Sequence, residues 1–155
     1  MRFNHSLNRF HAMFGLMVVV IICSVLIGCS SEVNYTPPAG NNEIAITHYS
    51  FGKIVVDGKT YENDIVIFPD RTVQNWQASI NHSIRLIDTK ALMTGPVNKL
   101  IIGIGFNNGC SVTDDIVEYA ASKNIELHIL DTREAVKLFN GSSKDGLAAC
   151  FHVNC

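Results

Sequence analysis

The pattern of hydrophobic and polar positions divides the chain into three zones. Residues 13–27 form an almost unbroken apolar run, and residues 30–43 are polar without periodicity. Residues 44–155 alternate short apolar runs with turn signals. The polar zone contains Pro37-Pro38 and is typical of a linker. We therefore predict a targeting segment over residues 1–28, a linker over residues 29–43 and one domain over residues 44–155.

The first half of this domain is predicted to consist of strands. Runs of apolar and β-branched residues predict strands over these ranges: 44–49, 53–56, 59–61, 64–68 and 73–76. The dipeptide Asp57-Gly58 predicts a hairpin, because both turn positions favour residues that tolerate positive φ. Residues 77–85 are mostly polar, and we interpret them as a loop.

The second half alternates helices and strands. Asp88 is predicted to cap a helix over residues 89–93, and Asp131 a helix over residues 132–140. A helix over 111–124 is expected to bury one face, with these residues inward: Ile116, Val117, Tyr119 and Ala120. Strands are predicted over these ranges: 99–104, 125–130 and 147–153, the first two with the apolar character of fully covered strands. This order predicts a three-layer α/β domain with a mixed central β-sheet, an N-terminal β-hairpin and a β-α-β-α-β C-terminal half.

The N-terminal zone has the pattern of a secretory signal. Arg2 and Arg9 precede the apolar run, which ends at Gly28-Cys29. The last four residues of this segment, 26–29, resemble the bacterial lipobox, which implies cleavage before Cys29 and a diacylglycerol on its thiol. The alternative is an uncleaved transmembrane helix, for which the run is marginally long enough. Either way the domain is expected in the cell envelope, outside the cytoplasmic membrane, and Ser30 favours the outer membrane if the host is Gram-negative.

The charge of the chain excludes one class of partner, and its cysteines leave two redox states open. Without residues 1–28 the chain keeps ten basic and fourteen acidic residues, a net charge of −4. Since no basic cluster is present, we predict that the protein does not bind nucleic acid. Three cysteines fall in the domain: Cys110, Cys150 and Cys155. A disulfide from Cys110 to either of the others and buried thiols are both compatible with the sequence.

One glycine-rich loop is the candidate ligand site. It joins a predicted strand to a helix, and its candidate residues are Gly103, Gly105, Asn107, Gly109 and Cys110. With Asp131 further on, the loop resembles a dinucleotide-binding motif. The glycine spacing is one residue too long, and Asp114 and Asp115 occupy the helix's first turn, where a phosphate would bind. We therefore predict no cofactor, while this strand end remains the default place for a small ligand.

No constellation predicts catalysis or a structural metal. Cys150 and His152 share one face of the last strand, and we interpret them as a core thiol and a hydrogen-bonded imidazole. The histidines show no spacing typical of zinc ligands: His48, His82, His128 and His152. The large aromatics near loops, Tyr49 and Trp76, are interpreted as closing the edge of the core, with a partner-anchoring role as the alternative.

Several short motifs together resemble a known family. They are Tyr49-Ser50-Phe51-Gly52-Lys53-Ile54, Val56-Asp57-Gly58, Pro69-Asp70, Leu100-Ile101-Ile102-Gly103, Asp131-Thr132, Phe139-Asn140 and Ala148-Ala149 followed by His152 and Cys155. In this order they resemble the Mth nine-three-eight-like domain family, whose relatives include the adipogenesis-associated domain protein and a mitochondrial complex I assembly factor. The chain departs from the family at Ile104 and Asn154, where threonine is usual. The resemblance implies a compact three-layer fold without an established enzymatic activity, and an assembly branch that acts by binding other proteins.

Two functional hypotheses follow. The first is a membrane-tethered, non-enzymatic lipoprotein that binds or assembles a partner protein, held to the membrane through Cys29. The second is a small ligand-binding protein or thiol-dependent enzyme that uses the strand-end loop, with Cys110 as the thiol.

Overall fold

A computed structural model describes residues 32–36, 43–77 and 82–154. The predicted signal segment and Cys29 lie outside these residues. Within them, no helix combines the length and the apolar character needed to cross a bilayer.

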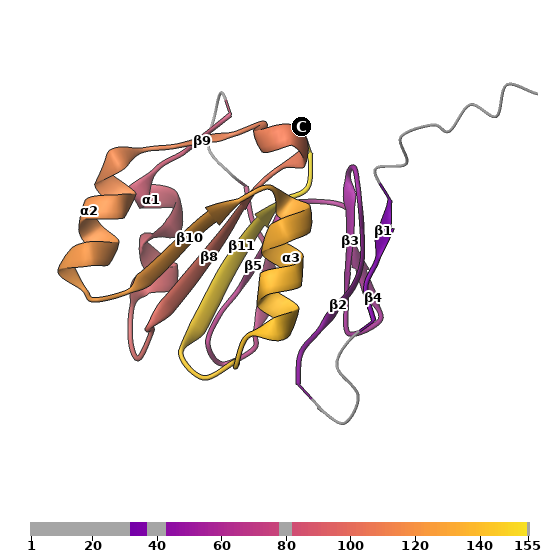
Figure 1. Cartoon of the computed structure of the whole chain (residues 1–155), viewed down its shortest axis with the longest axis horizontal. Coiled ribbons are helices and arrows are strands. Elements are labelled where there is room, and N and C mark those ends of the chain that lie inside the picture. Colours follow the sequence, from indigo (N-terminus) through magenta and orange to yellow (C-terminus); the bar gives the residue numbers. More distant parts are fainter. Residues whose placement is uncertain (1–31, 37–42, 78–81, 155) are drawn as a thin grey trace, which may run out of the picture.

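A five-stranded mixed sheet forms the centre of the domain (Figure 1). Its strands, in spatial order, are β10 (Glu126–Leu130), β8 (Lys99–Ile104), β11 (Leu147–His152), β5 (Ile65–Ile67) and β6 (Val73–Asn75). The first three are parallel, and β5 and β6 run antiparallel to their neighbours. The predicted mixed central sheet is therefore confirmed.

Both faces of this sheet are covered, which explains the apolar runs of β8 and β11. Ile101 and Phe151 face one core, together with the helix α3 (Thr132–Gly141). Their neighbours Ile102 and Cys150 face the other core, against the helix α2 (Asp114–Ser122). Successive residues of a strand point to opposite faces, so a strand buried on both sides must be apolar at every position.

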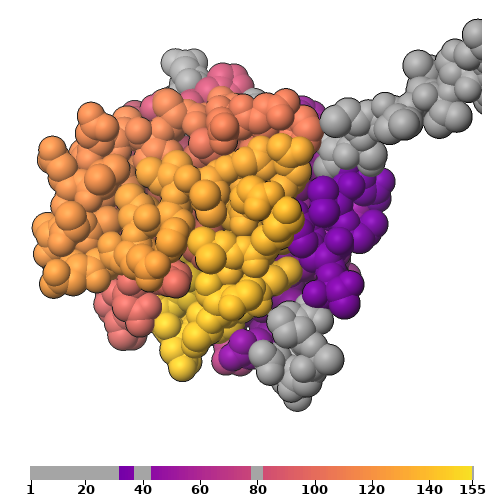
Figure 2. Space-filling model, in the orientation of Figure 1, coloured from indigo at the N-terminus to yellow at the C-terminus, as the bar shows by residue number. Residues whose placement is uncertain are grey.

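The N-terminal strands form a second sheet instead of joining the central one. This antiparallel sheet consists of β1 (Val33–Asn34), β2 (Ile46–Ser50), β3 (Lys53–Val56) and β4 (Lys59–Tyr61). It packs beside α3 on the same face of the central sheet, and Figure 2 shows the indigo strands directly against the golden helix. The predicted hairpin is confirmed, because β3 and β4 pair in antiparallel orientation around Asp57 and Gly58, whose φ angles are 48° and 77°.

The strand β1 corrects the predicted linker. Val33 pairs with Tyr49 and Asn34 with His48, and the Tyr35 N–H donates to the Thr47 carbonyl at 2.9 Å. Residues 33–35 of the predicted linker are therefore paired with β2.

The helices on the other face depart from the prediction in their bounds. The helix α1 (Leu86–Thr89) continues as the 3₁₀ turn η1 (Lys90–Met93), so the helical segment starts three residues earlier than predicted. Asp88 is not the cap but lies in the first turn, where its carboxylate accepts a hydrogen bond from the Arg85 N–H at 2.9 Å. Asp131 does cap α3, since its carboxylate accepts from the Arg133 N–H at 2.9 Å.

Two further corrections concern α2 and β10. The predicted helix over 111–124 starts only at Asp114, because Ser111–Val112 form the strand β9, which pairs in parallel with β7 (Ser83–Ile84) inside the predicted loop. Val117, expected inside, is 48% exposed. The strand β10 is an edge strand with Ile129 36% exposed, so it is not covered on both faces as expected.

Candidate functional site

A buried carboxylate–imidazole pair lies at the end of the central sheet. Asp64 directly precedes β5, and His152 is the last residue of β11. Because these strands are antiparallel, the start of one meets the end of the other. The Asp64 Oδ2 lies 2.7 Å from the His152 Nδ1, and the Asp64 Oδ1 accepts a hydrogen bond from the Val153 N–H at 2.8 Å. The carboxylate therefore fixes both the ring and the backbone beside it.

This pairing determines which nitrogen of His152 is available for chemistry. In the neutral ring, the carboxylate accepts a hydrogen bond from the Nδ1–H, and Nε2 is then the nitrogen with a lone pair. The Nε2 atom is buried and makes no hydrogen bond with any residue that the structure describes. A buried polar atom without a partner costs free energy, and this nitrogen is therefore a candidate ligand atom.

His82 and Cys110 complete a cluster around His152. One ligand atom from each of the three residues can be chosen so that all lie within 4.8 Å of one another. Cys110 and His152 are buried, whereas His82 is exposed. The cluster therefore joins the interior of the domain to its surface.

Backbone pairing brings these three residues together. The parallel strands β7 and β9 align Ser83 with Ser111, so the preceding residues His82 and Cys110 lie side by side. The Ser111 N–H donates to the His82 carbonyl at 2.8 Å, and the Cys110 N–H donates to the Ile104 carbonyl at 2.9 Å. Ile104 is aligned with His152 in the β8–β11 ladder. The β7–β9 and β8–β11 registers together therefore bring His82, Cys110 and His152 into one cluster.

The predicted ligand loop is largely occupied by its own chain. The Gly105 N–H donates to the Thr132 hydroxyl at 2.8 Å, and the Asn107 N–H to the Asp131 carboxylate at 3.0 Å. Gly103 lies in β8, where an added Cβ would stand 2.9 Å from the Thr132 Oγ1. These glycine and amide groups therefore serve packing and turn geometry, and Cys110 is the loop residue that reaches the cluster.

Asp131, at the start of α3, has a lowered pKa because of its contacts with Arg133. Burial would raise the pKa of Asp131, but hydrogen bonds from the Arg133 side chain and backbone outweigh it and hold that pKa below its usual range. Arg133 also stacks on the Phe106 ring, 4.3 Å from its centroid.

Burial raises the pKa of the Cys150 thiol, which is fully enclosed by the core. Cys150 is an unbridged thiol, as the buried-thiol interpretation expected, and Cys155 lies outside the described residues.

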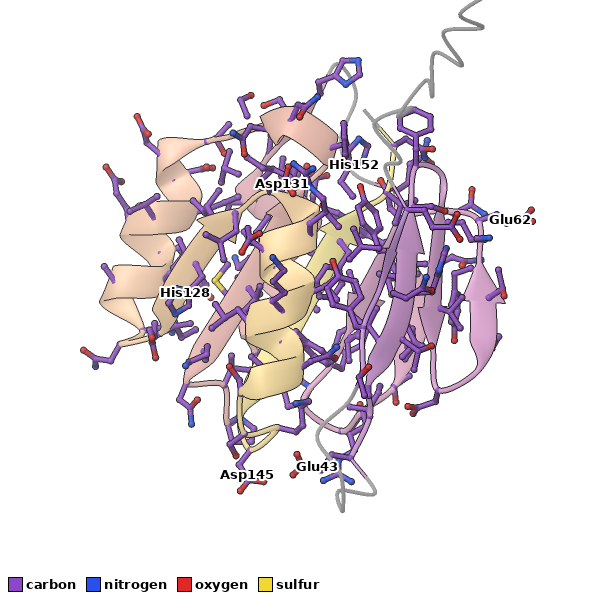
Figure 3. All side chains as sticks on the ribbon, turned by 45° about the vertical axis from the view of Figure 1, so that its right-hand side comes forward. Glu43, Glu62, His128, Asp131, Asp145 and His152 are labelled. Atoms are coloured by element: carbon purple, nitrogen blue, oxygen red, sulfur yellow. The ribbon has the colours of Figure 1, made fainter. Side chains whose placement is uncertain are left out.

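A polar cavity of about 520 Å³ opens beside the buried carboxylate. It is lined by Asn63, Asp64, Asn75, Trp76, Gln77 and Asn154. Another cavity, of about 650 Å³, includes Asp145 in its lining and belongs to the opposite edge, as the labels of His152 and Asp145 show in Figure 3. The cluster and the polar cavity thus occupy the same edge of the sheet.

Tyr49 and Trp76 both pack against the cores of the domain, to different extents. Tyr49 is completely buried, and that burial raises the pKa of its hydroxyl to about 12. Trp76 is partly buried, and its Nε1–H donates to the Asp88 carbonyl at 3.1 Å, which ties β6 to α1. The partner-anchoring alternative is therefore wrong for Tyr49.

Sequence spacing could not reveal the cluster. Asp64, His82, Cys110 and His152 are spread along most of the domain, and none stands in a short motif with another. The expectation that no zinc site exists rested on such motifs alone. The available signal was positional: Asp64 is the first residue of one predicted strand, and His152 lies in the last.

Solved structures of other proteins share this fold. A conserved hypothetical protein from Pyrococcus horikoshii matches with 25% identity and a TM-score of 0.60, over 71% of this chain and 98% of its own. An outer membrane protein from Bartonella henselae matches with 16% identity and a TM-score of 0.60, over 73% of this chain and 97% of its own. A Bordetella pertussis protein described as a Mth938-like domain matches with 16% identity and a TM-score of 0.55, over 79% and 92% of the two chains.

The family model described as "Protein of unknown function (DUF498/DUF598)" matches residues 46–152. This range contains β2 to β11, and with them Asp64, His82, Cys110 and His152. Together with the likeness to a Mth938-like domain, the match confirms the resemblance drawn from the motifs. The chain therefore belongs to the DUF498/DUF598 family of uncharacterised α/β proteins.

Proposed function

We propose that this protein is an envelope lipoprotein, anchored through Cys29, whose domain binds a partner protein at the membrane surface without catalysing a reaction. The observation that carries the proposal is the position of β1 relative to the lipobox-like segment. Only residues 30–32 separate Cys29 from Val33, the first residue of β1. Four extended residues span about 13 Å, so the domain would be held close to the lipid.

The short tether also gives the domain an orientation. Val33 pairs with Tyr49, and a few residues further along, the Gly52 N–H donates to the Val153 carbonyl at 2.8 Å. The first described strand therefore begins at the edge of the fold that carries His152, and Figure 1 shows the start of β1 and the C-terminal end at the same side. An anchored domain would turn this edge toward the membrane.

Exposed apolar side chains favour a protein partner. Ile87 on α1 is 78% exposed and Val117 on α2 is 48% exposed, while Ile129 lies on the unpaired edge strand β10. The helix α2 contacts both α1 and β10. Contiguous exposed apolar patches mark protein-binding surfaces, and we propose that these three residues are part of one. One of the structural relatives is described as an outer membrane protein, which agrees with an envelope location.

The test is in-cell crosslinking of the tagged full-length protein, followed by pull-down from membranes. Cys29→Ala removes the lipid attachment, and Cys23→Ala is the matched control because it changes a cysteine in the same segment. We expect one abundant partner with the wild-type and Cys23→Ala proteins and its loss with Cys29→Ala. Ile87→Ser should also weaken capture. Equal capture by the Cys29→Ala protein would refute the role of the anchor.

A second candidate function uses the cluster as a thiol-dependent enzyme or small-ligand site. Cys110 would be the nucleophile, His152 its base and Asp64 the group that orients the base. The observation that favours it is the Asp64–His152 contact of 2.7 Å. The test is the alkylation rate of Cys110 in the full-length protein. A rate no higher than that of a model thiol, and unchanged by His152→Gln, would contradict an activated nucleophile.

A further inference from the structure

We propose that His82, Cys110 and His152 bind a transition-metal ion of the zinc class. The proposal does not depend on the membrane anchor. It begins from the donor set, which is one thiol and two imidazoles. These are the ligands that Zn²⁺ and its borderline-soft neighbours prefer, whereas Ca²⁺ and Mg²⁺ require oxygen ligands.

The separation of the donors suits such an ion. If the three ligand atoms stood at the corners of a triangle with sides of 4.8 Å, the largest separation present, each corner would lie about 2.8 Å from the centre. Zinc bonds to nitrogen and sulfur measure about 2.0–2.3 Å. The sulfur would therefore move inward by about 0.5 Å and the nitrogens by about 0.8 Å on binding, which small side-chain rotations can supply.

The orphaned nitrogen of His152 is an independent sign of a ligand. His152 is 9% exposed, and its Nε2 has no hydrogen-bond partner among the described residues. A metal ion would use this lone pair.

Asp64 supplies the support that a metal-binding histidine normally has. Imidazole ligands usually donate their second N–H to a carboxylate or a carbonyl, which fixes the tautomer and orients the ring. The 2.7 Å contact from the His152 Nδ1 to the Asp64 Oδ2 is this arrangement. Because Asp64 also accepts the Val153 N–H, the carboxylate that orients the ring is itself held in place.

The arrangement favours a metal over a catalytic triad. A triad requires one imidazole beside the thiol, whereas a second imidazole, from His82, lies within 4.8 Å here. Cys110 is 4% exposed, which limits the access of a substrate to its sulfur. A small ion needs less space, and the exposed His82 gives it a route from solvent. Three protein ligands leave one position for water or for a ligand from a partner, as in open zinc sites.

The test is metal binding by the full-length protein, purified in detergent, treated with a chelator and kept under reducing conditions. Zn²⁺ is added in competition with a chromophoric chelator, and Co²⁺ serves as the spectroscopic probe. We expect one Zn²⁺ per chain and a thiolate-to-cobalt charge-transfer band. Cys110→Ser should abolish the band, and His82→Ala should weaken Zn²⁺ binding at least tenfold.

Two variants separate binding from folding. His82 is exposed, so His82→Ala should keep the fold, whereas His128→Ala is the matched control because His128 pairs with Glu126, away from the cluster (Figure 3). Asp64→Asn should lower Zn²⁺ affinity by about 10–100-fold if the carboxylate orients the ligand. Zinc binding that is unchanged in both His82→Ala and Cys110→Ser, or the absence of zinc binding by the wild-type protein, would overturn the proposal.

Discussion

Replacing Gly103 by alanine should destabilise the domain strongly. A Cβ at this position would stand 2.9 Å from the Thr132 Oγ1, 3.1 Å from the Phe151 Cδ1 and 3.2 Å from the Thr132 Cα. The last atom belongs to the backbone at the first turn of α3, so a side-chain rotation cannot remove the overlap. The helix would have to move away from the sheet.

The magnitude follows from two contributions. Overpacking of a close-packed core costs about 1–3 kcal/mol. The Thr132 hydroxyl also accepts from the Gly105 N–H and donates to the His152 carbonyl, each at 2.8 Å. A displaced hydroxyl weakens both buried hydrogen bonds, at about 1 kcal/mol each. We therefore expect Gly103→Ala to lower the free energy of unfolding by about 3–5 kcal/mol.

Urea unfolding of the full-length protein measures this change. The chain contains one tryptophan, Trp76, whose fluorescence reports on the central sheet. Gly141→Ala is the matched control, because an added Cβ at the end of α3 meets no atom within 4 Å. The control should be neutral or stabilising by up to about 1 kcal/mol. A Gly103→Ala protein within about 0.5 kcal/mol of wild type would refute the close-packing argument.

Three further predictions concern single residues. Thr132→Val should cost about 2 kcal/mol or more, because it leaves the Gly105 N–H and the His152 carbonyl without their partner, while Thr132→Ser should restore most of the loss in the same urea assay. Asp131→Ala removes the α3 cap and should cost about 1 kcal/mol at pH 7. Because the pKa of Asp131 is lowered in the folded state, its stabilisation is complete above the ordinary pKa of an aspartate and is lost as the pH falls through the folded value. The difference between wild type and Asp131→Ala should therefore shrink below about pH 4, and a constant difference would contradict the cap's ionic character. Tyr49→Phe should leave the free energy of unfolding within about 0.5 kcal/mol of wild type, because the buried hydroxyl makes no hydrogen bond with a described residue, and a larger loss by thermal unfolding would show a missed partner.

Local signals in the sequence predicted the local parts of the fold. Asp57-Gly58 predicted its hairpin because positive φ is a property of those two residues, and Asp131 predicted the start of α3 because a cap acts within one turn. The apolar run of β8 predicted a central strand for the same kind of reason, since both its faces are buried.

Local signals in the sequence could not predict the order of the strands in the sheet. The run 125–130 looks like a central strand, yet β10 lies at the edge, because strand order depends on contacts between distant segments. The cluster was missed for the same cause. His82 and Cys110 meet through the β7–β9 pairing of two-residue strands inside segments that read as loop and helix. Because the cluster forms through the pairing of distant strands, no periodic pattern in the sequence indicates it.

If the domain is anchored through Cys29, the pairing of β1 determines the length of chain between the lipid and the domain, which is short while β1 is paired and longer once β1 detaches. Its pairing with β2 extends over only two residues, and Tyr35 adds a hydrogen bond from its hydroxyl to the Arg133 carbonyl at 3.0 Å. A pull on a lipid-anchored N-terminus would act on this short ladder before it reached the core. Peeling β1 away would free the chain up to Glu43, so the contour between lipid and domain would grow from about 13 Å to about 45 Å. The domain would behave as a load-sensitive spacer, close to the bilayer at rest and able to reach outward under tension.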